Sequence, residues 1–134
     1  MCYNLSMSKK ESVNIWVEGA NDALDSAYKL VESKKYHHAL FFLHLALEKI
    51  LKALYISTKD EAPPYIHNLK QIAQHAGFEL NEEELLQLDE ISEFNVSARY
   101  DEYKYKIYKR ATKEYTEKWM KIGEDLYNRF KNLI

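Results

Sequence analysis

The stretch YHHALFFLHLALEKILKALYIS, residues 36–57, decides the fold class of this chain. Its apolar residues recur every three or four positions, which is the period of one face of an α-helix. The members of this face are Ala39, Leu40, Leu43, Ala46, Leu47, Ile50, Leu51 and Leu54. Phe42, Leu45 and Ala53 extend the apolar surface nearly around the helix. We therefore expect a central helix that packs against more than one neighbour.

The residues before this stretch predict a second long helix, from about Ser8 to Ser33. Apolar side chains follow the helical period here too. They are Val13, Trp16, Ala20, Ala23, Leu24, Ala27, Leu30 and Val31. Only Ser33, Lys34 and Lys35 separate the two helices. A link this short predicts an antiparallel hairpin.

The residues after the central helix predict a break and then a short helix. Pro63 and Pro64 are adjacent, and paired prolines cannot lie inside a helix. We expect the short helix over about residues 68–76, with Gly77 as a left-handed stop.

Two more helices are expected in the remainder of the chain. Asn81 and Glu84 have the spacing of a capping box, which predicts the start of a helix that ends near Phe94. An irregular segment near residues 96–108 should follow. The last helix then begins between Tyr108 and Thr112 and continues to the end, with its apolar residues again at helical spacing.

The composition agrees with one helical domain. The chain has 134 residues, 46% of them hydrophobic, and only three glycines and two prolines. These values favour long helices around a real core, and no strand-like alternation competes with them. The sequence predicts an all-α, up-and-down antiparallel bundle of four to five helices. We expect a single domain over residues 1–134, with a loose tail at residues 1–9.

Several functional classes are disfavoured by the same sequence. No segment approaches the roughly 20 apolar residues of a membrane span, and the single cysteine predicts a cytoplasmic protein without an internal disulfide. The three glycines are too dispersed for a phosphate-binding loop. His37 and His44 share a helix face but lie about 10 Å apart, which is too far for one metal ion. The sequence predicts neither a metal site nor a cofactor.

Residues 99–113 concentrate positive charge in a chain whose net charge is −2. Six basic residues stand against Asp101 and Glu102, and four tyrosines are interleaved with them. The tyrosines are Tyr100, Tyr103, Tyr105 and Tyr108. Cations hold phosphates and phenol rings stack on bases, so this pattern fits single-stranded RNA or a nucleotide. An acidic partner protein or a merely solvated segment remains an alternative.

The chain also resembles the HEPN domain family (higher eukaryotes and prokaryotes nucleotide-binding). The resemblance rests on Trp16 and Ala20, the segment ALEKILKAL at 46–54, HNL at 67–69 and ARY at 98–100, and covers roughly residues 10–132. It implies a helical bundle that is commonly a homodimer. Many prokaryotic members are encoded beside a minimal nucleotidyltransferase, with which they form toxin–antitoxin or similar two-component systems. Many are metal-independent RNases whose site is an arginine and a histidine with four to six residues in between.

Arg99 matches the arginine of that RNase motif, but the histidine has no match. Lys104, Tyr105 and Lys106 stand at the required positions. RNA cleavage needs a group that exchanges a proton near neutral pH. Histidine does so with an ordinary pKa of about 6.5, whereas lysine and tyrosine lie near 10. The sequence therefore favours a binding module without the standard Arg–His RNase site.

Two alternatives to the binding module stay open. The first is a metal-independent RNase toxin in which Arg99 works with a displaced histidine, either His67 or His44. The second is a structural protein-interaction bundle that shares only the fold of the family.

For the binding module, the expected contacts with nucleotide or RNA are Arg99, Tyr100, Tyr103, Lys104, Tyr105 and Lys106. In systems of this family some nucleotidyltransferases place AMP on a tyrosine beside the Arg–His motif. The resemblance thus makes Tyr103, Tyr105 and Tyr108 candidates for modification by their neighbourhood. Elsewhere, Glu48 and Lys52 form an i,i+4 pair, and Glu48 would need such a partner if it faced a buried seam. His67 is expected to cap the short helix or to dock it to the bundle.

Overall fold

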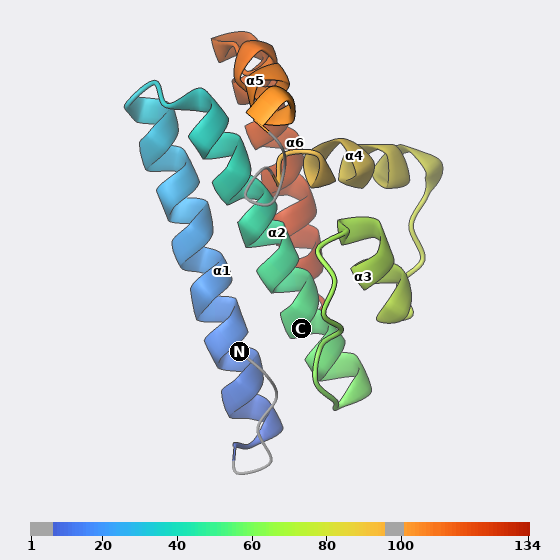
Figure 1. Cartoon of the computed structure of the whole chain (residues 1–134). Helices are drawn as coiled ribbons and strands as arrows, with labels where there is room; N and C mark the ends of the chain where they lie inside the picture. Colours follow the sequence, from blue (N-terminus) through green and yellow to red (C-terminus); the bar gives the residue numbers. More distant parts are fainter. Residues whose placement is uncertain (1–6, 96–100) are drawn as a thin grey trace.

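The computed structural model describes residues 7–95 and 101–134, and this part of the chain is all-α, without a strand (Figure 1). Its six helices are α1 (Lys9–Glu32), α2 (Tyr36–Lys59), α3 (Leu69–His75), α4 (Glu82–Ser92), α5 (Asp101–Arg110) and α6 (Lys113–Lys131). The predicted helical bundle is confirmed. The predicted tail at residues 1–9 lies largely outside the described residues, and Lys9 already belongs to α1.

The first two helices form the predicted antiparallel hairpin, seen side by side in Figure 1. The Ser8 side chain caps α1 by accepting a hydrogen bond of 3.1 Å from the backbone N–H of Glu11. Lys34 turns the chain with a left-handed φ of 60°. At its far end α2 stops at Lys59, before the two prolines, and Asp60 again has a left-handed backbone.

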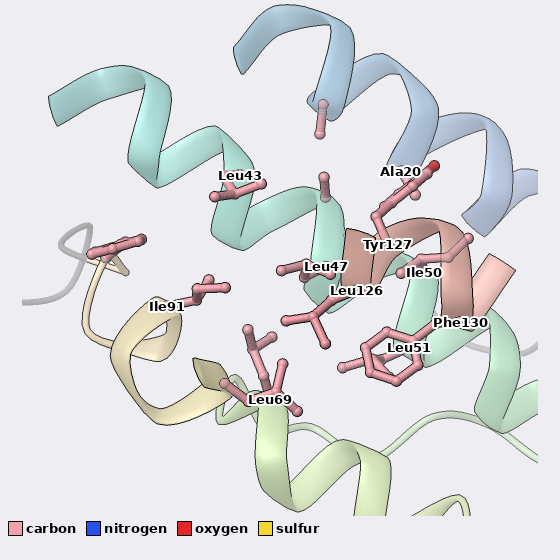
Figure 2. Close-up of a cluster of buried hydrophobic side chains, with 14 of the residues drawn as sticks. Ala20, Leu43, Leu47, Ile50, Leu51, Leu69, Ile91, Leu126, Tyr127 and Phe130 are labelled. Atoms are coloured by element: carbon pink, nitrogen blue, oxygen red, sulfur yellow. The ribbon is translucent and has the colours of Figure 1, made fainter. Parts of the chain in front are cut away.

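Helix α2 lies at the centre of the core, as its nearly all-round apolar surface predicted. Figure 2 shows four of its fully buried side chains, Leu43, Leu47, Ile50 and Leu51, facing residues of four other helices. The facing residues are Ala20 of α1, Leu69 of α3, Ile91 of α4, and Leu126, Tyr127 and Phe130 of α6. One helix therefore supplies most of the surface on which the others pack.

Helix α6 is antiparallel to α1 and hence runs in the same direction as α2. The Tyr28 hydroxyl of α1 donates to Glu124, whereas Asn21, two turns earlier on α1, accepts from Tyr127, one turn later on α6. This register fixes the direction of α6. The connection through α3, α4 and α5 returns the chain to the end of the bundle where α2 begins (Figure 1).

The short helices begin and end as their local sequence predicted. The Asn68 side chain caps α3 through the backbone N–H of Gln71 at 3.0 Å. Gly77 has the left-handed φ of 80° expected of a stop. Asn81 and Glu84 form both hydrogen bonds of a capping box at the start of α4.

The prediction of an irregular segment near residues 96–108 was wrong for its described part, because α5 begins at Asp101. Two acidic residues in its first turn and two basic residues in its last turn complement the helix dipole. Tyr103 and Ile107, four positions apart, face the bundle, and Ile107 is buried. The bundle therefore has six described helices instead of four to five. Thr112 then caps α6, so the last helix starts beside the predicted range.

No helix in the described ranges combines the length and the hydropathy that a membrane span requires.

Candidate functional site

The start of α2 and residues 104–108 of α5 line an open pocket with a volume of about 490 Å³. His37, His38 and Phe41 line it from α2. Lys104, Tyr105, Ile107 and Tyr108 line it from α5. Figure 1 shows α5 at the end of the bundle where α1 turns into α2, and the pocket therefore lies at that end. Segments more than 60 residues apart in the sequence thus form one surface.

Aromatic rings cover much of this pocket. His37 meets Tyr108 edge to face, with ring centroids 5.0 Å apart, and lies 4.0 Å from the ring of His38. Tyr105 and Tyr108 are stacked at 6.3 Å, and their side chains are 59% and 57% exposed. Exposed rings of this kind offer stacking faces to a planar ligand.

Lysines lie beside the rings. A neighbouring hollow of about 420 Å³ is lined by Lys34, Lys35 and Lys109 together with Tyr36 and Tyr108. With Lys104 and Lys106 these make five exposed lysines, which we call the basic end: Lys34, Lys35, Lys104, Lys106 and Lys109. Within residues 7–95 and 101–134, none of them pairs with a carboxylate. Their charge is therefore available to an anionic ligand.

The pKa of His37 is lowered from its ordinary value. Partial burial is the main cause, and the positive charges of His38 and Lys35 act in the same direction. The ring of His37 is therefore neutral at pH 7. The Nζ of Lys109 lies 5.5 Å from the ring centre of Tyr105, a cation–π contact that leaves the ammonium at the surface.

Arg110 serves a different purpose from the lysines of α5. It lies 3.5 Å from Glu90 and 3.7 Å from Glu93, which ties α5 to α4. The Tyr115 hydroxyl donates to the same Glu90, and burial together with this contact raises the pKa of Tyr115. Arg110 is thus a structural cation.

A second polar cluster lies farther along α2. Lys52 donates to Glu48 at 2.9 Å, and both side chains are more than nine-tenths buried. Nδ1 of His67 lies 3.1 Å from both carboxylate oxygens of Glu48. His44 is buried, and its Nε2 lies 3.2 Å from the backbone oxygen of His67. Burial lowers the pKa of His44. This arrangement supplies the partner that a buried Glu48 requires.

A family model, HEPN domain, matches residues 13–133. The chain belongs to the HEPN domain family. Membership gives the chain a nucleotide- or RNA-related function at the level of the family. No curated protein and no solved structure matched the chain.

The contact residues that were predicted from the sequence of this HEPN domain fall into three groups: two outside the described residues, three exposed on α5, and the half-buried Tyr103. Arg99 and Tyr100 lie outside the described residues. Lys104 and Tyr105 line the pocket, and Lys106 is exposed on the same helix.

Tyr103 is half-buried and its hydroxyl donates to the backbone oxygen of Glu93 at 3.2 Å. Of the tyrosines predicted as modification candidates, Tyr105 and Tyr108 are the exposed ones.

The two histidines considered for a displaced RNase site lie in the second cluster. His44 has a side chain only 2% exposed, and His67 is 60% exposed. His67 docks the loop before α3 onto α2 through its contact with Glu48, and docking is one of the two roles predicted for it. The cap of α3 is provided by Asn68 instead.

Sequence reasoning missed His37, His38 and Phe41 as pocket residues of this HEPN domain. It treated His37 only as half of a metal pair with His44. Among the described residues no group of three or more His, Cys, Asp or Glu side chains is arranged to hold a metal ion. The available signal was the neighbouring Lys34 and Lys35, which add charge beside the histidines.

Proposed function

We propose that this HEPN domain binds single-stranded RNA or a nucleotide at the basic end. The observation that carries the proposal is the pocket between α2 and α5, with its exposed Tyr105 and Tyr108 rings, its Lys104, and the lysines of the neighbouring hollow. Five lysines without carboxylate partners in the described structure attract phosphates, and the two phenols receive bases. The charge is local, since the whole chain carries −2.

The same surface supports binding in place of the standard RNase chemistry. The positions where the family motif has its histidine are Lys104, Tyr105 and Lys106, and all three are exposed on α5. Histidine, which the family uses for proton transfer, stands at none of these positions, and lysine and tyrosine as residue types have ordinary pKa values near 10. We therefore propose a module that holds its ligand without standard Arg–His cleavage.

Binding is tested by fluorescence anisotropy with an end-labelled single-stranded oligoribonucleotide of about 12 nucleotides. The test variant is Lys104→Ala/Lys109→Ala. The matched control is Lys9→Ala/Lys10→Ala, which removes two exposed lysines at the opposite end of the hairpin (Figure 1). We expect the test variant to bind more weakly and its salt slope to fall by about 1.4, because each phosphate contact contributes about 0.7. Equal losses in both variants, or no binding by the parent, would refute the proposal.

A displaced-histidine RNase is the second candidate, because His37 and His38 line the pocket. A neutral His37 is able to accept a proton. Cleavage that persists in excess chelator, disappears in His37→Ala and needs Arg99 would establish this enzyme. An intact oligonucleotide after prolonged incubation supports the binding module.

We also propose that the domain is a homodimer and acts with a minimal nucleotidyltransferase in a toxin–antitoxin-like system. Family membership is the support for both. Sedimentation at micromolar concentration tests the dimer, and a mass of one chain would contradict it. Co-purification with a nucleotidyltransferase encoded beside it, reduced by loss of the basic end, tests the partner.

A further inference from the structure

A second groove lies beside the Glu48 cluster, where α1, α2 and the loop before α3 meet. Its volume is about 210 Å³, and Trp16, Lys49, Lys52, Tyr65 and His67 are among its walls. Along α2, the distance from His37 at the basic end to Lys52 corresponds to roughly 22 Å of helix. The two hollows share no lining residue.

The charges in this groove do not cancel. Burial alone would raise the pKa of Glu48, but Lys52 and His67 together hold it below the ordinary value. Glu48 is thus ionised and neutralises one lysine. Lys49 is half-buried, and in the described ranges it has no carboxylate partner. Two lysines and one glutamate leave the groove with a positive charge.

The side chain of Lys49 packs against Gly19 of α1. A Cβ built at Gly19 would lie 3.4 Å from both Cδ and Nζ of Lys49, so the lysine side chain lies against the bare helix backbone. Its ammonium is therefore held at the groove, partly withdrawn from water. A charge withdrawn from water without a counter-charge is costly, and a bound anion would remove that cost.

The remaining walls supply donors and a flat face. An ammonium has three N–H donors, and Lys52 directs one to Glu48, so others remain for a ligand. The same ammonium lies 5.8 Å from the ring centre of Trp16. Nδ1 of His67 is committed to Glu48, which leaves Nε2 as the second polar atom of that ring. Tyr65 is 89% exposed at the rim.

We propose that this groove is a binding site for a small phosphate-bearing anion, whose phosphate contacts Lys49 and Lys52. The volume of about 210 Å³ accommodates a phosphate or a small phosphate ester and is below the range of about 300 to 1,000 Å³ usual for larger ligands. Inorganic phosphate and the phosphate of a mononucleotide share this chemistry. The site is independent of RNA binding at the basic end.

Isothermal titration calorimetry with sodium phosphate and with AMP tests the site, with sodium chloride at matched ionic strength as the blank. Lys49→Met keeps the length of the stem and removes the charge, and Lys49→Arg restores a charge. We expect saturable phosphate binding by the parent, at least about tenfold weaker binding by Lys49→Met, and binding retained in Lys49→Arg. If AMP binds more tightly than phosphate and Trp16→Leu removes the difference, the ligand is a nucleotide. If the two bind equally, the phosphate alone is recognised.

Two controls separate this proposal from the function proposed above. Lys104→Ala/Lys109→Ala should bind phosphate as the parent does, and Lys49→Met should bind the oligoribonucleotide as the parent does. Circular dichroism confirms that each variant is folded. The proposal would be overturned if the parent bound neither phosphate nor AMP saturably. It would also be overturned if the parent and Lys49→Met bound phosphate equally. Loss of phosphate binding in the Lys104→Ala/Lys109→Ala variant would also overturn it.

Discussion

Helix α6 approaches α2 at Gly123, and a single added methyl group should disrupt this contact. Gly123 is buried, and a Cβ built on it would lie 2.5 Å from Cδ1, 2.7 Å from Cδ2 and 2.9 Å from Cγ of Leu43. Leu43 is fully buried, so its side chain cannot move aside into solvent. We predict that Gly123→Ala destabilises the protein even though alanine is the better helix former.

The magnitude follows from two opposing terms. Replacing glycine by alanine inside a helix gains about 1 kcal/mol of intrinsic propensity. Forcing an extra methyl into a packed core costs about 1 to 3 kcal/mol. Gly123→Ala should therefore lose up to about 2 kcal/mol of unfolding free energy. Gly19→Ala is the matched control, because its new methyl would be in ordinary contact with the flexible end of Lys49, 3.4 Å away.

Urea unfolding followed by circular dichroism measures both variants. The propensity term is common to them, so Gly123→Ala should be about 1 to 3 kcal/mol less stable than Gly19→Ala. Leu43→Ala should relieve the clash, so that the double variant with Gly123→Ala loses less than the sum of the two single losses. If Gly123→Ala proves as stable as Gly19→Ala, the close approach of the two helices is refuted.

Three further predictions concern buried polar groups. Lys52→Met leaves the buried Glu48 charge without its nearest partner and should cost about 3 kcal/mol in urea unfolding, most of it recovered by adding Glu48→Gln; an unchanged midpoint would contradict the ion pair. Burial lowers the pKa of His44 below 6.5, so its contribution to stability is present above pH 6.5 and is lost as the pH falls through the folded-state value. Below about pH 6.5, the unfolding free energy of His44→Phe should therefore fall less steeply with pH than that of the parent, and an unaltered slope would contradict this. Burial raises the pKa of Tyr127 to about 12, so its stabilisation is present below pH 10 and is lost towards pH 12. Tyr127→Phe should remove part of that alkaline loss. In an absorbance titration, the number of tyrosines that titrate near pH 10 should be the same in the parent and in Tyr127→Phe. A loss of one such tyrosine in the variant would contradict the raised pKa.

The bundle could be predicted because its information is local. The central position of α2 follows from apolar residues on nearly every side, and the ends of α3 and α4 follow from Gly77 and from the Asn81–Glu84 capping box. Each of these signals lies within a few residues of the feature that it determines. Helix α5 was missed because its lysines and tyrosines were interpreted by their charge. Only Ile107 and Tyr103 mark its inward face, and two residues are too few to show a period.

The candidate site could be predicted only in part, because half of it depends on tertiary contact. Lys104 and Tyr105 were identified from the composition of their own segment. His37 and His38 were not, because nothing in their spacing shows that α5 folds over them. The groove at Lys49 depends on its packing against Gly19, 30 positions earlier in the chain. Sequence patterns report which residues share a helix face, but the helices that meet across a turn or a loop are set by packing.

The placement of the two pocket histidines favours binding over scission at the basic end. Attack by a 2′-hydroxyl is in line, so the group that removes the proton and the group that protonates the leaving oxygen stand on opposite sides of the phosphorus. The rings of His37 and His38 lie 4.0 Å apart, which puts both on one side of any phosphate between α2 and α5. On the α5 side the polar groups are Lys104 and the phenols of Tyr105 and Tyr108, which suit phosphate and base contacts. Together, one wall of imidazoles and one wall with a lysine and two phenols can hold an RNA strand, but the lining contributed by α5 places no imidazole opposite His37 and His38.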